Sequence, residues 1–126
     1  MTGNNLLFDT NILIYLSKGE LELKKIIGQY DRIYISVISY MEALGYSFKD
    51  ENEKQLIENL LQSIEIIQTD LQIANTVVEI RKVKRIKTPD AIIFSTAKKL
   101  NADLMTVNTN DFKGLDKSVK IINPFL

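Results

Sequence analysis

Apolar residues along the chain fall into short blocks that alternate between a strand pattern and a helix pattern. Runs of apolar and β-branched residues predict buried strands at 6–8, 32–35, 64–67, 104–107 and 119–122. Apolar residues at helical spacing predict helices at 12–16, 20–30, 37–48 and 51–61, a long helix after Asp70, and a last one reaching about Leu100. Strands that alternate with helices predict an α/β fold, with a central parallel sheet of about five strands and helices on both faces.

Residues with capping chemistry mark where several of these helices begin. Asp9, Ser36 and Asp70 each stand directly before a predicted helix and can accept a hydrogen bond from its first turn. Thr88-Pro89-Asp90 predicts another start, with Thr88 at the cap and Pro89 at the first helical position. The polar stretch 108–116, which contains Gly114, is predicted to be a loop.

The composition limits both the fold and the chemistry. At 126 residues, of which 45% are hydrophobic and 25% charged, the chain has the profile of one globular domain, so we expect residues 1–126 to form a single domain. Cysteine is absent, which excludes disulfides and thiolate catalysis. Residues 1–5 are polar and uncharged, and no membrane span follows, so a cytoplasmic location is expected.

The absence of histidine excludes further classes of site. Zinc sites of the usual kinds, Ser-His-Asp triads and histidine-based nucleases all need a residue that this chain lacks. Any catalysis must therefore come from carboxylates, lysines, hydroxyls, amides or a bound metal ion.

Four acidic residues from distant parts of the sequence are predicted to meet at one edge of the sheet. Ligands of open parallel sheets bind outside the carboxyl ends of the strands, where the strand order reverses. The acids that fall at this edge are Asp9, Glu42, Asp90 and Asp111. The placement of Asp90 requires one of the two helices between the third and fourth strands to run crosswise. Each aspartate also has a structural explanation, as a helix cap, a first-turn residue or a turn residue.

Carboxylates crowded together repel one another unless a cation neutralises them. Oxygen ligands without nitrogen or sulfur select Mg²⁺ or Mn²⁺. Such ions can activate a water and bind the oxygens of a phosphoryl group during its displacement, without histidine.

A stretch of five cations, Arg81, Lys82, Lys84, Arg85 and Lys87, is the candidate RNA-binding surface. The 16 basic and 16 acidic side chains of the chain cancel, so any contact with nucleic acid should be local. The alternative is a solvated helix end, because cations near a helix C-terminus complement its dipole.

Taken together, these segments resemble PIN-domain nucleases, and most closely the VapC-like toxins of toxin–antitoxin pairs. The matching segments are Phe8-Asp9-Thr10-Asn11, Ser36-Val37-Ile38-Ser39-Tyr40-Met41-Glu42, Pro89-Asp90-Ala91-Ile92-Ile93, Leu104-Met105-Thr106-Val107-Asn108-Thr109-Asn110-Asp111-Phe112 and Ile121-Ile122-Asn123-Pro124-Phe125. Each motif is weak, but their order and spacing over residues 8–125 make the combination specific.

The resemblance implies roles for particular residues. Asp9, Glu42 and Asp90 match three catalytic metal-site acids, and the fourth is either Asp111 or the position of Asn108; we take Asp111 as the acid and Asn108 as an accessory. Asn11 and Thr106 are expected to be accessory groups that orient the site.

The resemblance also implies an activity and partners. It implies a Mg²⁺- or Mn²⁺-dependent endoribonuclease that cuts single-stranded RNA to give 5′-phosphate and 3′-hydroxyl ends, acting as the toxin of a pair. An antitoxin partner and a homodimer are expected, and the large apolar residues Tyr15, Tyr40, Tyr46 and Phe48 modestly favour self-association.

Several alternatives compete with this interpretation. A phosphoacceptor receiver domain would need two adjacent early acids, and an Asp-x-Asp phosphatase would need an acid where Asn11 stands. No glycine-rich phosphate loop is present. An RNA-maturation nuclease without an antitoxin, or a PIN-like scaffold that binds RNA or a partner without cutting, remain as alternatives.

Overall fold

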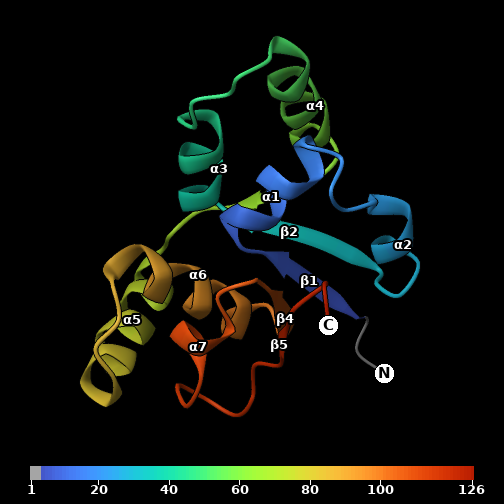
Figure 1. The fold of residues 1–126 in the computed structure, drawn as a ribbon. Helices are drawn as coiled ribbons and strands as arrows, with labels where there is room; N and C mark the ends of the chain where they lie inside the picture. The colour runs from blue at the N-terminus through green and yellow to red at the C-terminus, as the bar shows by residue number, and fades with distance from the viewer. Residues whose placement is uncertain (1–3) are drawn as a thin grey trace.

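A five-stranded parallel sheet runs through the computed structural model, which describes residues 4–126 (Figure 1). Its strands are β1 (Asn5–Phe8), β2 (Arg32–Ser36), β3 (Glu65–Ile67), β4 (Ala102–Met105) and β5 (Ile121–Ile122). The order across the sheet is β3-β2-β1-β4-β5, and every neighbouring pair is parallel. The chain adds β2 and β3 on one side of β1 and then crosses to the other side. The strand order therefore reverses beside the carboxyl ends of β1 and β4.

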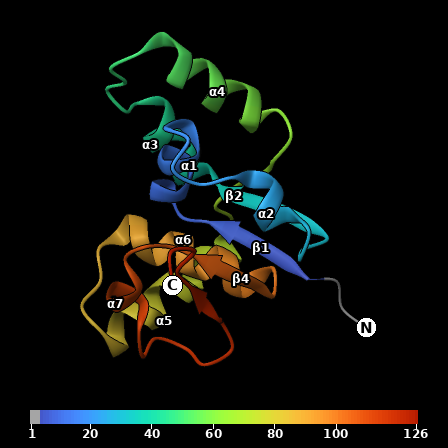
Figure 2. The same cartoon turned by 45° about the vertical axis from the view of Figure 1, so that its right-hand side comes forward.

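Helices cover both faces of this sheet, which confirms the predicted α/β class. They are α1 (Thr10–Ser17), α2 (Leu23–Ile27), α3 (Val37–Leu44), α4 (Glu51–Leu61), α5 (Leu71–Val83), α6 (Thr88–Lys99) and α7 (Thr109–Phe112). The first four lie on one side of the sheet and the last three on the other (Figures 1 and 2). None of the helices described over residues 4–126 is both long and apolar enough to cross a membrane.

The central strand β1 is buried on both faces. Leu6 and Phe8 belong to the core cluster that includes residues of α1, α3 and α4, whereas Leu7 belongs to the cluster formed with α5, α6 and α7. All three side chains are 0% exposed. The alternation follows from the two-residue period of a strand, and the double burial explains why β1 is a continuous apolar run.

Several predicted boundaries are wrong by a few residues. The fourth strand is Ala102–Met105 rather than 104–107, and the fifth is reduced to Ile121–Ile122. The helix expected over 20–30 is only Leu23–Ile27, with Ile26 as its one buried residue, because Gly28 follows it directly. The helix expected over 37–48 ends at Leu44, where Gly45 forms the C-cap.

Two further details correct the predicted helix starts and loops. Lys87, not Thr88, is the N-cap of α6, so Thr88 and Pro89 both lie in the first turn. The predicted loop 108–116 contains the short helix α7, whose Phe112 is buried at 2% exposure and stacks on Phe94. The buried aromatic side chain anchors this polar segment to the core.

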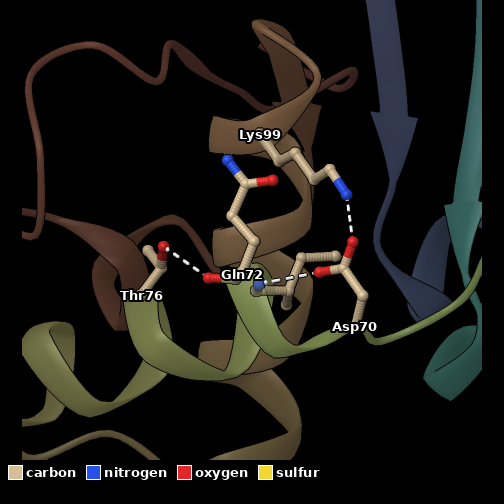
Figure 3. Close-up of polar contacts among 5 residues, drawn as sticks. Asp70, Gln72, Thr76 and Lys99 are labelled. Carbon is tan, nitrogen blue, oxygen red and sulfur yellow. Dashed lines mark hydrogen bonds and ion pairs between the residues drawn. The ribbon is translucent and has the colours of Figure 1, made fainter.

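The long helices α5 and α6 form an antiparallel pair, which returns the chain to the carboxyl edge of the sheet. As predicted, Asp70 caps α5: its Oδ1 accepts a hydrogen bond from the Ile73 amide at 2.9 Å. Its Oδ2 pairs with Lys99 in the last turn of α6 (Figure 3). Within α5, the Thr76 hydroxyl donates to the Gln72 carbonyl at 3.2 Å. Since the start of α5 meets the end of α6, the start of α6 lies at the opposite end of the pair.

Substitutions at Asp70 should separate its two roles. Asp70→Asn keeps a good capping side chain but loses the ion pair, and should lower the melting temperature by on the order of 2 °C at neutral pH. Asp70→Ala also loses the cap and should lower the melting temperature further.

Lys99, with the Ile73 amide, holds the pKa of Asp70 below its usual value of 3.8. The wild-type advantage over Asp70→Asn is therefore full above that value and should vanish as the pH falls through the lowered pKa. Thermal denaturation at several pH values measures both effects, and a pH-independent difference would contradict them.

Candidate active site

Asp9 lies at the carboxyl end of the central strand and is almost completely buried, at 4% exposure. It is the N-cap of α1, and its Oδ1 accepts a hydrogen bond from the Thr10 amide at 2.8 Å. Its own amide donates to the Met105 carbonyl at 2.9 Å, which continues the pairing of β1 with β4. The backbone and the side chain of Asp9 are therefore both fixed by the fold.

Asn11 and Thr106, predicted as accessory residues, both contact Asp9. The Thr106 hydroxyl, which is completely buried, donates to Asp9 Oδ2 at 2.7 Å, and the side-chain amide of Asn11 donates to the same oxygen at 3.1 Å. The Thr106 oxygen in turn accepts a hydrogen bond from the Asn108 amide at 3.0 Å. These contacts join the segments that follow β1 and β4, at the point where the strand order reverses.

Glu42 projects toward the same edge from α3 and is held by Thr10. The Thr10 hydroxyl donates to Glu42 Oε1 at 2.6 Å, and its oxygen lies 2.9 Å from the Ser39 hydroxyl. Thr10 and Ser39 were not among the site residues predicted from the sequence. A signal was present, because Thr10 directly follows Asp9, and Ser39 precedes Glu42 by three residues and so shares its helix face.

Asp90 and Asp111 lie together beside the basic segment that links α5 to α6. A pocket of about 410 Å³ is lined by Asp90, Asn110 and Asp111 together with residues 84–87. Asp90 is half-buried in the first turn of α6, and Asp111 is exposed in α7. The charge of Asp9 also acts on Asp90, so the start of α6 lies near the same edge of the sheet as Asp9. The chain reaches this edge through the antiparallel pair of α5 and α6, rather than through the crosswise helix expected from the sequence.

The electrostatics of this edge are those of crowded like charges. Burial raises the pKa of Asp9, and the Glu42 carboxylate raises it further, while hydrogen bonds from Thr106, Thr10 and Asn11 act in the opposite direction. Burial also raises the pKa of Asp90, and the charges of Asp9, Asp111 and Glu42 add to that effect; Lys87 opposes it. Asp9 and Asp90 therefore lie in surroundings that disfavour their charged form, and neighbouring acids contribute to this at both positions.

A divalent cation fits this donor set, because all the side chains concerned offer hard oxygen atoms and a cation would relieve their repulsion. Asp9, Glu42, Asp90 and Asp111 are the residues that could hold it. Within residues 4–126, however, no group of three or more acidic side chains lies close enough to bind one ion in the arrangement observed. The four acids share an edge without forming a closed cage of ligands.

The five cations predicted to bind RNA divide into different environments. Arg81 and Lys82 are in the last turn of α5, where Arg81 donates to the Ile86 carbonyl at 3.2 Å and Lys82 pairs with Glu79 at 3.3 Å. Arg85 and Lys87 are exposed and line the pocket beside Asp90. Lys84 is half-buried and bound to main-chain carbonyls. Arg85 and Lys87 therefore remain the cations best placed to meet a phosphate group near the acids.

An α/β sheet whose order reverses at an edge lined with carboxylates defines a class of site suited to phosphate chemistry. Comparison with protein families then identifies the group, because the PIN domain matches residues 6–118. The chain belongs to the PIN-domain family, whose members are nucleases. Comparison with curated protein sequences gives no match.

Solved structures agree with this assignment. A toxin–antitoxin complex from Klebsiella pneumoniae is 35% identical, with a TM-score of 0.78 over 94% of this chain and 97% of that one. VapBC-1 from nontypeable Haemophilus influenzae is 26% identical, with a TM-score of 0.74 and coverage of 94% and 97%. VapBC2 from Rickettsia felis, solved with a fragment of promoter DNA, shares the fold at 24% identity and a TM-score of 0.77, with coverage of 94% and 98%. The chain is thus a PIN domain similar to VapC toxins.

Repulsion among the acids predicts how the metal-free protein responds to Asp90→Asn. This change removes a carboxylate whose ionised form is disfavoured in the folded state, so it should raise the melting temperature in chelator at neutral pH by a few degrees. Since the folded-state pKa is raised, the penalty exists above that value and should disappear as the pH falls toward 3.8. Glu58→Gln, on the exposed side of α4, is the matched control and should change nothing. A lower melting temperature for Asp90→Asn in chelator would contradict the electrostatic interpretation.

Proposed function

We propose that this protein is a metal-dependent endoribonuclease that cleaves single-stranded RNA, and that it acts as the toxin of a toxin–antitoxin pair. The observation that carries the proposal is that Asp90 lines one pocket with Asp111 and lies near enough to Asp9 and Glu42 for all three carboxylates to act on it. Four acids that repel one another at the carboxyl edge of a PIN domain are the arrangement that a divalent metal ion would stabilise.

Each residue at the edge has a defined part in this proposal. Asp9, Glu42, Asp90 and Asp111 would hold Mg²⁺ or Mn²⁺, which would supply charge neutralisation and water activation. Thr106 and Asn11 orient the Asp9 carboxylate, and Thr10 orients that of Glu42. Arg85 and Lys87 attract the phosphodiester backbone to the pocket beside Asp90.

Cleavage of a labelled single-stranded RNA in the presence of Mg²⁺ or Mn²⁺ tests the activity. Asp9→Asn and Asp90→Asn should each lower the cleavage rate by at least about 100-fold, because an amide keeps the shape of a carboxylate but removes the charge that binds the metal. Glu58→Gln should cleave at the wild-type rate, and chelator should stop cleavage by the wild type and by Glu58→Gln. Cleavage that persists in chelator would refute the metal mechanism. RNA binding without cleavage by the metal-loaded wild type would identify a non-catalytic scaffold instead.

The proposed toxin role rests on the similarity to structures of toxin–antitoxin complexes. An inhibitor that presents an arginine or lysine to the acidic edge would be attracted by the same negative charge that favours a metal ion.

A homodimer is also proposed. Among the aromatic residues considered for self-association, Tyr40 and Tyr46 are exposed at 37% and 40%, whereas Tyr15 packs against Phe125.

If the protein is a toxin, the product of the neighbouring gene should bind it and stop RNA cleavage when present in equimolar amount. A cleavage assay titrated with that product measures the inhibition, and light scattering of the protein alone measures dimer formation. An RNA-maturation nuclease would keep its activity in the presence of every neighbouring gene product. A monomer at micromolar concentration would refute the proposed dimer without affecting the proposed activity.

A further inference from the structure

Lys84 differs from the other cations of the 81–87 stretch in both burial and contacts. It is the only one of the five that is half-buried; the other four are exposed. Its backbone is anchored as the C-cap of α5, with its amide donating to the Ile80 carbonyl at 3.2 Å. Ile80 is itself part of the core between α5, α6 and the sheet. The side chain therefore extends from a rigid support.

The Lys84 ammonium group donates to three main-chain carbonyls of the α7 segment. The Nζ atom lies 2.8 Å from the Asn110 oxygen, 3.2 Å from that of Asp111 and 3.1 Å from that of Lys113. An ammonium group has three hydrogen atoms to donate, so these contacts match its full capacity. A phosphate oxygen would have to displace one of them.

These carbonyls need a partner, because α7 has only four residues. Its last carbonyl groups cannot find partners inside the helix, and a helix this short is unstable by itself. A lysine at the carbonyl end satisfies those oxygens and complements the helix dipole. α7 is thus held from two sides, by Phe112 in the core and by Lys84 at the carbonyl end. Figure 2 shows the segment after α5 beside α7, in agreement with these contacts.

We propose that Lys84 is a positioning residue that fixes α7 and thereby holds Asp111 beside Asp90, rather than a residue that binds RNA phosphate. Asp111 belongs to α7 and lines the same pocket as Asp90, so the position of its carboxylate depends on the conformation of this short helix. The inference rests on the proposed function only in taking Asp111 as a metal-site acid. It differs from the sequence-based expectation that Lys84 contributes to the RNA-binding surface.

The variant Lys84→Met tests the proposal, because it keeps the aliphatic stem and removes the ammonium group. Hydrogen–deuterium exchange should become faster by about ten-fold in residues 109–113, while exchange in the sheet stays as in the wild type. The affinity for Mn²⁺, measured by calorimetry without RNA, should fall by about ten-fold. Lys84→Arg, which keeps the positive charge, should restore part of the protection of residues 109–113 and part of the affinity for Mn²⁺. Lys54→Met, a lysine on the exposed side of α4, is the matched control and should change neither.

The salt dependence of RNA binding separates positioning from phosphate contact. With a labelled single-stranded RNA in chelator, Lys84→Met should leave the slope of log Kd against log salt unchanged. Loss of a phosphate contact would reduce that slope by about 0.7, as expected for Lys87→Met. Unchanged exchange in α7, or a reduced slope for Lys84→Met, would overturn the proposal. If the wild type binds neither Mn²⁺ nor RNA, the proposed function fails, while the exchange measurement still decides whether Lys84 holds α7.

Discussion

The buried carboxylate of Asp9 is the constraint on which the arrangement of this edge depends. A carboxylate at 4% exposure is costly unless its oxygens are hydrogen-bonded, and here the Thr10 amide, the Thr106 hydroxyl and the Asn11 amide meet that need. These donors come from α1 and from the segment after β4, so satisfying one carboxylate ties together the two strands at the point of reversal. The donors offset the cost of burial only in part, because the pKa of Asp9 remains raised.

The other acids reach the edge through separate structural devices. Glu42 depends on α3 and on the Thr10 hydroxyl, Asp90 on the antiparallel pairing of α5 with α6, and Asp111 on a helix of four residues. Asp9 alone is buried, whereas Asp90 is half-buried and both Glu42 and Asp111 are exposed, so the structural support is strongest at Asp9. A site built in this way has a rigid centre and an outer part that depends on single contacts.

The fold class and the shared edge of the four acids could be predicted from the sequence, because they follow from local patterns and from the general geometry of parallel sheets. Asp70 and Ser36 were identifiable as caps because capping depends on neighbouring residues. The role of Lys84 could not be predicted, because its partners are backbone carbonyls 26 to 29 residues away, which carry no sequence signature. The same holds for α7. Its polar sequence predicts a loop, because the stacking of Phe112 on Phe94 is a long-range contact that the local sequence does not reveal.

The central place of β1 has a consequence for synthesis of the chain on the ribosome. The Thr106 hydroxyl that supports Asp9 lies 97 residues further along the sequence, and β4 must pair with β1 before the two can meet. A nascent chain that has emerged only as far as α6 already contains Asp9, Glu42 and Asp90, but it lacks the strand that holds the first of them. The acidic edge can therefore be completed only after β4 and Thr106 have also emerged. The chain order itself thus delays the appearance of a folded site until the whole segment from β1 to Thr106 is outside the ribosome.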